Sequence, residues 1–245
     1  DGVVLDKLGG EAWQRRKARL KERITEMAGE LMKTAAERAL RHAPIFEPET
    51  SAFNQFVDRF PWQETEDQEH AIEDVLGDLS QGKPMDRLVC GDVGFGKTEV
   101  ALRAAFVAAM AGYQVAVVAP TTLLARQHFT GFSDRFAGFP LNVGRLSRLV
   151  TDKEARTTRE GLANGTTDVV VGTHALLSKN VQFKNLGLVI VDEEQRFGVT
   201  HKEKLKELTA GVDVLTLSAT PIPRTLNMAL SGLRGMSTLE EPPHN

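Results

Sequence analysis

The chain has 245 residues, of which 41% are hydrophobic and 26% charged, and its formal net charge at pH 7 is −3. This composition is typical of a globular protein with one sizeable core, and a single cysteine, Cys90, excludes an internal disulfide. The slightly acidic balance gives no general attraction to nucleic acid, so binding of a polyanion would require a local basic surface. No apolar run reaches transmembrane length and no signal peptide opens the chain, so we expect a cytoplasmic protein with no membrane partner.

The first predicted element is a long amphipathic helix over residues 8–41. Leu20, Ile24 and Met27 recur at spacings of three or four, which places them on one apolar stripe. Gly29 interrupts the pattern at a cost of about 1 kcal/mol relative to Ala, which predicts a bend or break there.

A linker and a change of pattern follow this helix. The basic run at 15–23 indicates a solvated helix face, with contact to DNA phosphates as the alternative. Pro44 and Pro48 then favour a linker. The chain opens on Asp1 and not on Met, so we expect a piece of a longer protein. The predicted division is a helical connector at 1–42, a linker at 43–52 and one large domain at 53–245.

Short apolar runs alternate with helical segments through the large domain. The runs are apolar almost throughout, as strands covered on both faces require. This succession predicts an α/β fold with a doubly wound parallel sheet, in which ligands bind at the carboxyl ends of the strands. The predicted strands are 87–90, 114–119, 142–146, 168–172, 186–191 and 212–218, and the main helices are 99–110, 122–136, 152–163 and 201–209.

A helix is also predicted from residue 66 to about residue 79. Thr65 suits its N-cap, and Gln68 at the third helical position would close a capping box. A Gln side chain also suits a bidentate contact with adenine. The two interpretations of Gln68 are compatible.

Residues 91–98 fit the phosphate-binding pattern G-x-x-x-x-G-K-[ST] at every fixed position. A predicted strand enters this loop and a helix leaves it, which disfavours the alternative of a glycine-rich turn without a ligand. Backbone N–H groups would hold the phosphates, Lys97 would neutralise the outer ones, and the Thr98 hydroxyl would ligate Mg²⁺. The predicted nucleotide-binding residues are Gln68, Gly91, Asp92, Val93, Gly94, Phe95, Gly96, Lys97, Thr98 and Glu99.

The predicted strand 186–191 runs directly into a pair of acids. Asp192 would hold Mg²⁺ opposite Thr98, and Glu193 would orient and deprotonate the attacking water. An acidic loop without a ligand is the alternative, which the phosphate loop on the same predicted sheet edge disfavours. The predicted catalytic residues are Glu193, Lys97 and Gln195, and Ser218 and Thr220 are predicted either to couple this motif to a neighbouring surface or to cap the next helix.

Hydroxyl, amide and cationic side chains also follow other predicted strands. Such groups suit contacts to nucleic-acid phosphates, although ordinary helix capping explains each of them equally well. His174 as a metal ligand is rejected, because no second His or Cys stands at metal spacing. The predicted nucleic-acid contacts are Thr121, Gln127, Arg148, Thr173, His174 and Arg224.

Taken in order, these motifs resemble the first RecA-like lobe of superfamily 2 helicases and translocases. Within that group the runs 85–100, 196–199 and 218–232 are similar to the bacterial transcription-repair coupling factors. The RecG-like fork-remodelling helicases share part of the same runs. In the superfamily's terms, Gln68 falls in the Q motif, 91–98 in motif I, 121–127 in motif Ia, 172–174 in the TGxH-type element, 192–195 in motif II and 218–220 in motif III.

The resemblance implies a RecA-like P-loop NTPase fold with ATP and Mg²⁺ as cofactors. It implies ATP-driven movement on double-stranded DNA and, through the full-length protein, removal of stalled RNA polymerase and recruitment of excision-repair proteins. Gln195 departs from the His of many relatives. We also expect the second RecA-like lobe, with its arginine finger, to lie outside these residues, so that the isolated chain is nearly inactive. The alternatives are a RecG-like helicase lobe and a mainly non-catalytic interaction module.

Overall fold

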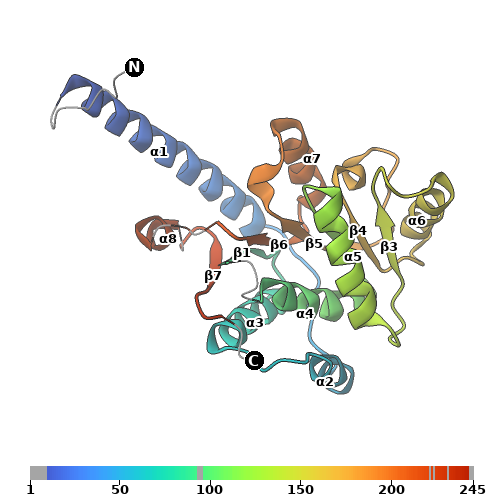
Figure 1. The fold of residues 1–245 in the computed structure, drawn as a ribbon. Helices are drawn as coiled ribbons and strands as arrows, with labels where there is room; N and C mark the ends of the chain where they lie inside the picture. Colours follow the sequence, from blue (N-terminus) through green and yellow to red (C-terminus); the bar gives the residue numbers. More distant parts are fainter. Residues whose placement is uncertain (1–9, 93–95, 221, 223, 231, 243–245) are drawn as a thin grey trace.

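The computed structural model describes residues 10–92, 96–220, 222, 224–230 and 232–242, and its centre is a seven-stranded sheet (Figure 1). The order across the sheet is β3-β4-β2-β5-β6-β1-β7, and all the paired strands are parallel, which confirms the predicted fold class. The strands are β1 (Asp86–Gly91), β2 (Gln114–Val118), β3 (Val143–Leu146), β4 (Val169–Gly172), β5 (Leu186–Asp192), β6 (Asp213–Ser218) and β7 (Gly235–Leu239).

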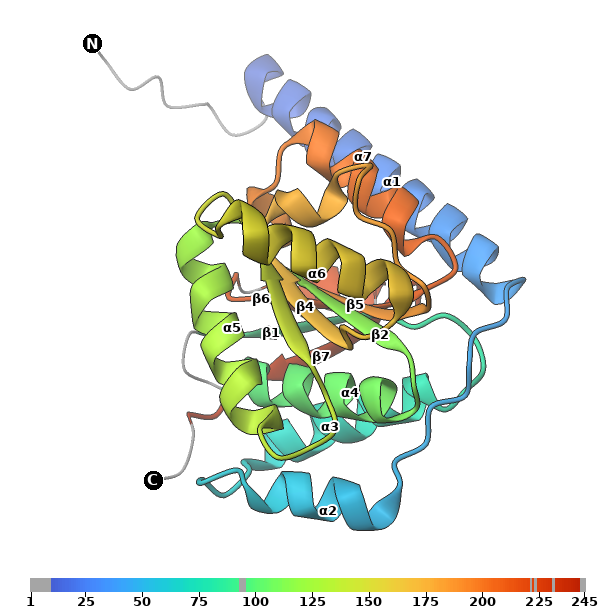
Figure 2. The ribbon, with the colours of Figure 1, turned by 90° about the vertical axis from the view of Figure 1, so that its right-hand side faces the viewer.

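Helices cover both faces of the sheet. In Figure 2, α2, α3 and α4 lie below the strands, and α6 and α7 lie above them. The helices are α1 (Glu11–Ala39), α2 (Thr50–Asp58), α3 (Glu66–Leu79), α4 (Lys97–Met110), α5 (Thr122–Phe136), α6 (Asp152–Asn164), α7 (Val199–Thr209) and α8 (Arg224–Leu230), with short 3₁₀ turns η1 (His174–Leu177) and η2 (Glu194–Arg196).

Alternate side chains of the central strands enter two separate cores. In β2, Val117 packs in the core that contains Phe106 of α4, while Val118 packs in the core that contains Leu162 of α6. A strand placed between two cores has no solvent-facing side, which is why these strands are apolar at nearly every position.

The sheet order brings the functional loops together. β5, β6 and β1 are neighbours, with Asp192 opposite Leu217 and Cys90 opposite Ser218. Because these strands are parallel, the loops that follow them leave from the same edge of the sheet. The phosphate-loop pattern, the acid pair and Ser218 therefore meet at one edge.

The connector and the linker each differ from the prediction in one respect. α1 is continuous through Gly29, so the predicted bend is wrong. The segment before α2 packs on the domain and is not a free linker: Phe46 is buried, its ring meets that of Tyr113 edge-on at 5.0 Å, and its N–H donates to the Leu79 carbonyl at 2.9 Å.

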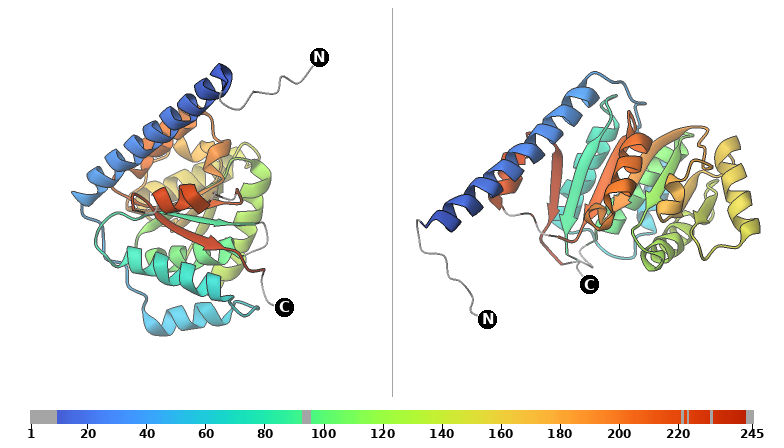
Figure 3. Two further views of the ribbon diagram at one scale, coloured as in Figure 1. Left: turned by 90° about the vertical axis from the view of Figure 1, so that its left-hand side faces the viewer. Right: turned by 90° about the horizontal axis from the view of Figure 1, so that it is seen from above.

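α1 is attached to the domain at its C-terminal end. The Arg38 guanidinium donates to the carbonyls of Val212 at 2.8 Å and Met85 at 3.1 Å, beside the starts of β6 and β1. No residue of α1 is buried, and its N-terminal half extends past the β7 edge of the sheet (Figure 3). Among the described residues, no helix combines the length and apolar character needed to cross a bilayer.

Candidate nucleotide site

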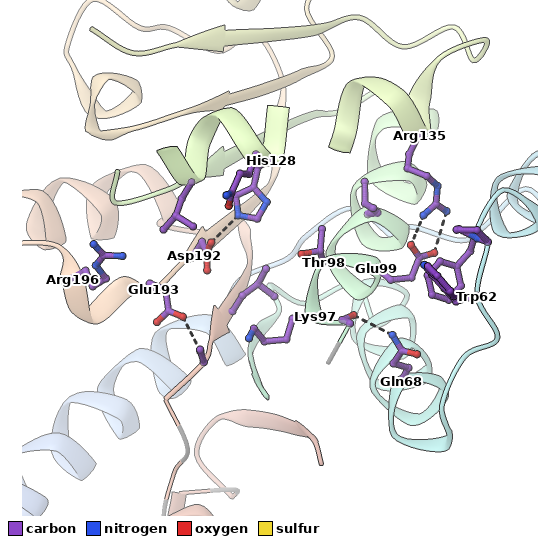
Figure 4. Close-up of a pocket in the computed structure, with 18 residues that line it drawn as sticks. Trp62, Gln68, Lys97, Thr98, Glu99, His128, Arg135, Asp192, Glu193 and Arg196 are labelled. Carbon is purple, nitrogen blue, oxygen red and sulfur yellow. Dashed lines mark hydrogen bonds and ion pairs between the residues drawn. The ribbon is translucent and has the colours of Figure 1, made fainter. Parts of the chain in front are cut away.

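A cleft of about 920 Å³ opens at the carboxyl edge of the sheet, between the N-terminus of α4, helix α5 and the loop after β5 (Figure 4). Apolar rings close one end of it and carboxylates lie at the other. Its polar lining includes Gln68, Lys97, Thr98, His128, Asp192 and Glu193. One predicted residue each for phosphate and for water, Lys97 and Glu193, and both predicted metal ligands therefore line one cavity.

The start of α4 requires a glycine. Gly96, its N-cap, has φ 90° and ψ 20°, and a Cβ there would lie 1.7 Å from the Gln68 amide nitrogen, so the position requires glycine. The Lys97 ammonium donates to the carbonyls of Gly91 and Asp92 within its own loop. The predicted residues Val93, Gly94 and Phe95 lie outside the described part of the chain.

Burial lowers the pKa of Lys97, while the negative charges of Glu193, Asp192 and Asp92 act in the opposite direction. The lysine is thus a partly desolvated cation that faces the acid pair. An added anion such as a phosphate would find both a positive charge and N–H donors at this place.

Gln68 closes the predicted capping box. Its Oε1 accepts from the Thr65 N–H at 2.9 Å, and its own N–H donates to the Thr65 hydroxyl at 3.1 Å. The amide nitrogen points to the Gly96 carbonyl at 3.5 Å, and the residue is fully buried. The structure therefore gives Gln68 a role in joining α3 to the phosphate loop, and its contact with adenine stays a prediction.

Glu99 was predicted to bind nucleotide, but its carboxylate already has partners. It accepts from Arg103 at 2.9 Å and from both terminal nitrogens of Arg135, and Arg103 also pairs with Glu64 at 2.5 Å. Glu99 is 4% exposed. Its role is to tie α4 to α5 and to the segment that carries Glu64, because two guanidinium groups occupy its oxygens.

Asp192, the predicted metal ligand, has a partner that the sequence analysis missed. His128 of α5 lies with Nε2 2.7 Å from Asp192 Oδ2, and both side chains are about 90% buried. The two residues are 64 positions apart. Only the pairing of β2 with β5, which is not readable from the sequence, places α5 beside Asp192.

Glu193 has φ 48° and ψ 55°, and it is the one non-glycine residue with positive φ in the described part of the chain. Such backbone occurs at functional sites when surrounding contacts hold it. Here the Glu193 N–H donates to the Leu217 carbonyl at 2.9 Å, and its Oε1 accepts from the Ala219 N–H at 2.8 Å. The end of β6 thus fixes both the backbone and the side chain of Glu193.

Gln195 joins the acid pair to the segment after β6. Its amide nitrogen donates to the Glu193 carboxylate and to the Thr220 hydroxyl at 3.3 Å. The Ser218 hydroxyl accepts from the Thr220 N–H at 3.1 Å. Gln195 therefore contacts Thr220, while Ser218 acts by shaping the turn.

The aromatic end of the cleft was also missed from the sequence. Phe60 and Trp62 line it, and Trp62 is 51% exposed although it is a large apolar side chain. An exposed indole in a cleft suits stacking against a planar ligand. The exposure of the Trp62 side chain is what indicates a ligand here, and a sequence alone does not show which side chains are exposed.

The predicted nucleic-acid residues do not all lie on one surface. Arg148 and His174 are exposed. Thr121 caps α5 and Gln127 lines the nucleotide cleft. The prediction that Thr173 contacts nucleic acid is wrong. Its side chain is 4% exposed and its hydroxyl accepts from the Ala175 N–H, so it caps η1 and cannot face solvent. The side chain of Arg224 lies outside the described part of the chain.

His174 belongs to a small cluster of basic side chains. Its ring stacks on that of His201 at 4.5 Å and 11°. Burial lowers the pKa of His174, and the charges of His201, Lys204 and Arg148 lower it further. The segments after β3 and β4 and helix α7 therefore bring basic side chains together.

The ligands available for a metal are oxygens. Thr98 and Asp192 line the same cleft from α4 and β5. No group of three or more His, Cys, Asp or Glu side chains with metal-binding geometry occurs among the described residues. Mg²⁺ is commonly held by one or two protein oxygens together with substrate phosphates, so this pair fits Mg²⁺ bound with a nucleotide.

The sequence of residues 65–229 matches the family model described as DEAD/DEAH box helicase. The chain belongs to the DEAD/DEAH box helicase family. Membership implies ATP binding by this lobe and agrees with the RecA-like arrangement of its strands and cleft.

Within this family, the chain is similar to transcription-repair-coupling factors. This helicase lobe is 54% identical over 241 residues to the transcription-repair-coupling factor of Bacillus subtilis (strain 168), covering 98% of this chain and 20% of the relative. It is 52% identical over 243 residues to that of Escherichia coli (strain K12), covering 99% of this chain and 21% of the relative. The chain thus spans about a fifth of the length of these relatives.

Among solved structures, RecG bound to a three-way DNA junction superposes with a TM-score of 0.78 at 36% identity, covering 95% of this chain and 32% of that one. The helicase MrfA bound to DNA superposes with a TM-score of 0.58 at 15% identity, over 83% of this chain and 32% of that one, which supports the fold alone.

Proposed function

We propose that the chain is the ATP-binding and ATP-hydrolysing first motor lobe of a translocase on double-stranded DNA that couples transcription to nucleotide-excision repair. One observation carries the ATPase part: Lys97, Thr98, Asp192 and Glu193 converge on one cleft at the sheet edge. The coupling role is supported by the similarity to transcription-repair-coupling factors, and it includes removal of stalled RNA polymerase through the full-length protein.

Each residue has a distinct task in this proposal. The N–H groups at the start of α4 and the Lys97 ammonium bind and neutralise the β- and γ-phosphates. Glu193, held by Ala219, orients the attacking water and accepts its proton. Thr98 and Asp192 would hold Mg²⁺, which supplies charge neutralisation on the phosphates when bound. Trp62 offers an aromatic face to the base.

The ATP site is tested by measuring nucleotide affinity of the 245-residue chain with Lys97→Ala. Loss of a charge-assisted contact to phosphate weakens Mg-ATP or Mg-ADP binding by about 10- to 100-fold. Lys184→Ala is the control, because Lys184 precedes β5 and lies at the opposite edge of the sheet. Calorimetry that gives one affinity for wild type and Lys97→Ala would overturn the proposal.

A RecG-like fork helicase is the second candidate, and the RecG superposition favours it. The two candidates share the ATPase chemistry and differ in their substrate. Strand displacement on a branched DNA by the full-length parent, without displacement of stalled RNA polymerase, would decide for the RecG-like function.

A further inference from the structure

A buried contact links the candidate metal ligand to the neighbouring helix. His128 Nε2 lies 2.7 Å from Asp192 Oδ2, and it is the one side-chain partner of that carboxylate within the described residues (Figure 4). His128 is 9% and Asp192 8% exposed. Since a carboxylate only accepts, Nε2 must carry the hydrogen.

The helix that carries His128 is itself held against α4. Arg135, two turns further along α5, pairs with Glu99, which directly follows Thr98. Near His128, the ring of Phe132 meets the imidazole edge-on at 6.4 Å. The position of His128 Nε2 is therefore fixed relative to Thr98 through the rigid length of α5.

The two candidate Mg²⁺ ligands are thus held in fixed positions relative to each other. Thr98 belongs to α4, Asp192 ends β5, and α5 joins them through Arg135 at one end and His128 at the other. Groups that hydrogen-bond a metal ligand orient it, and their loss commonly costs 10- to 100-fold in metal affinity. A carboxylate without such a partner would rotate about its side-chain bonds.

We propose that His128 is a positioning residue: its Nε2–H holds one oxygen of Asp192 so that the other oxygen faces Thr98 and the Mg²⁺ of a bound Mg-nucleotide. The inference rests on the proposed nucleotide site. The hydrogen bond of the His128 side chain goes to Asp192 and not to the phosphate loop. His128 therefore sets how much Mg²⁺ the site needs, and we expect metal-free nucleotide binding to stay unchanged without it.

A matched pair of amide variants separates this role from simple packing. His128→Gln keeps an N–H at the reach of Nε2, whereas His128→Asn withdraws it. Binding of a fluorescent N-methylanthraniloyl-ADP to the 245-residue chain is followed as MgCl₂ is added, and again in EDTA. We expect His128→Asn to need about 10-fold or more Mg²⁺ for half-maximal enhancement of binding. His128→Gln should stay near wild type, with all EDTA affinities equal.

Phe132→Leu is the packing control, because Phe132 is fully buried on the same helix and contacts the imidazole without touching Asp192. It should lower the unfolding temperature without moving the Mg²⁺ midpoint. The inference is overturned if His128→Asn titrates as wild type, if His128→Asn and Phe132→Leu shift the midpoint equally, or if His128→Asn loses affinity in EDTA. A wild-type chain that binds the probe without responding to Mg²⁺ overturns the proposed metal site as well; a normal wild-type response with an unshifted His128→Asn overturns this inference alone.

Discussion

Gly96 occupies a conformation that side chains avoid, at the point where the phosphate loop becomes α4. Its φ is 90°, and Gln68 fills the space that a Cβ would need. Gly112 has the same φ of 90° with nothing within 4 Å of such a Cβ. Substitution of Gly112 therefore tests backbone strain alone, whereas substitution of Gly96 tests the same strain together with the close approach of α3.

We expect Gly96→Ala to destabilise the chain more than Gly112→Ala. Left-handed backbone costs a non-glycine residue roughly 1–2 kcal/mol, and both variants bear that cost. The overlap with Gln68 adds about 1–3 kcal/mol at Gly96 only. Urea unfolding of the two variants measures the difference in the free energy of unfolding. Equal losses of stability would show that Gln68 moves away at no cost in free energy.

Asp213 is a buried carboxyl at the start of β6, far from the cleft. Its Oδ1 accepts from the Met85 N–H at 2.5 Å, and its Oδ2 has no hydrogen-bond partner among the residues that the structure describes. Burial raises the pKa of Asp213 from 3.8 to about 7, against the N–H of Met85 and the positive charge of Arg38, which lower it. The folded state therefore favours the neutral acid.

That shift predicts a pH-dependent stability. Because the folded pKa is the higher one, the stabilising contribution is complete below pH 3.8 and is lost as the pH rises to about 7. At 1.36 kcal/mol per pKa unit the change is about 4 kcal/mol. Denaturant unfolding at several pH values should show this decline in wild type and not in Asp213→Asn. A parallel pH dependence in both proteins would contradict it.

At the scale of elements, three neighbouring strands are each followed by a polar side chain. The order β3-β4-β2 puts Arg148, His174 and Thr121 after adjacent strands. We infer that this edge faces DNA phosphates, which position a protein on a duplex without reading sequence. Thr173 drops out of the predicted surface because its side chain is buried, with 4% exposed.

Arg148→Ala should weaken DNA binding by a similar factor on any sequence. Loss of one phosphate contact lowers the slope of log affinity against log salt by about 1. Fluorescence anisotropy with labelled duplex DNA at several salt concentrations measures both quantities. Lys184→Ala removes a charge from the opposite sheet edge and should leave the slope unchanged; an equal change in both variants would place the DNA elsewhere.

Elements with a strong pattern were predicted well and those without one were missed. The six apolar strands of the prediction and the helix at 122–136 match the structure within two residues at each end. β7 was missed because Gly235–Leu239 includes Gly, Ser and Thr and pairs only with β1 at the sheet edge. α2 was missed because prolines before it indicated a linker, and Gly29 did not break α1 because a single Gly costs only about 1 kcal/mol.

The site divides in the same way. The phosphate loop and the acid pair could be predicted because their spacing is local. The contact of His128 with Asp192 and the arginines around Glu99 could not, since each depends on which strands and helices become neighbours. The exposure of Trp62 likewise appears only after folding.

At the scale of the whole molecule, the chain forms one RecA-like lobe with its cleft open at the sheet edge. We expect this 245-residue chain to hydrolyse ATP very slowly and to gain little from DNA, because an arginine supplied across the cleft is worth about 10³ to 10⁵ in phosphoryl-transfer rate. Phosphate release with and without duplex DNA tests this, with Lys97→Ala as the background. Robust stimulation by DNA would contradict it.

The attachment of α1 through Arg38 has a mechanical consequence. At 1.5 Å per residue its 29 residues form a rod about 43 Å long, held at the end that touches the starts of β1 and β6. By simple geometry a tilt of about 10° at this pivot moves the free end by about 7.5 Å. Sub-ångström rearrangements in the strands that carry the nucleotide loops would thus become displacements of several ångströms at the free end of α1.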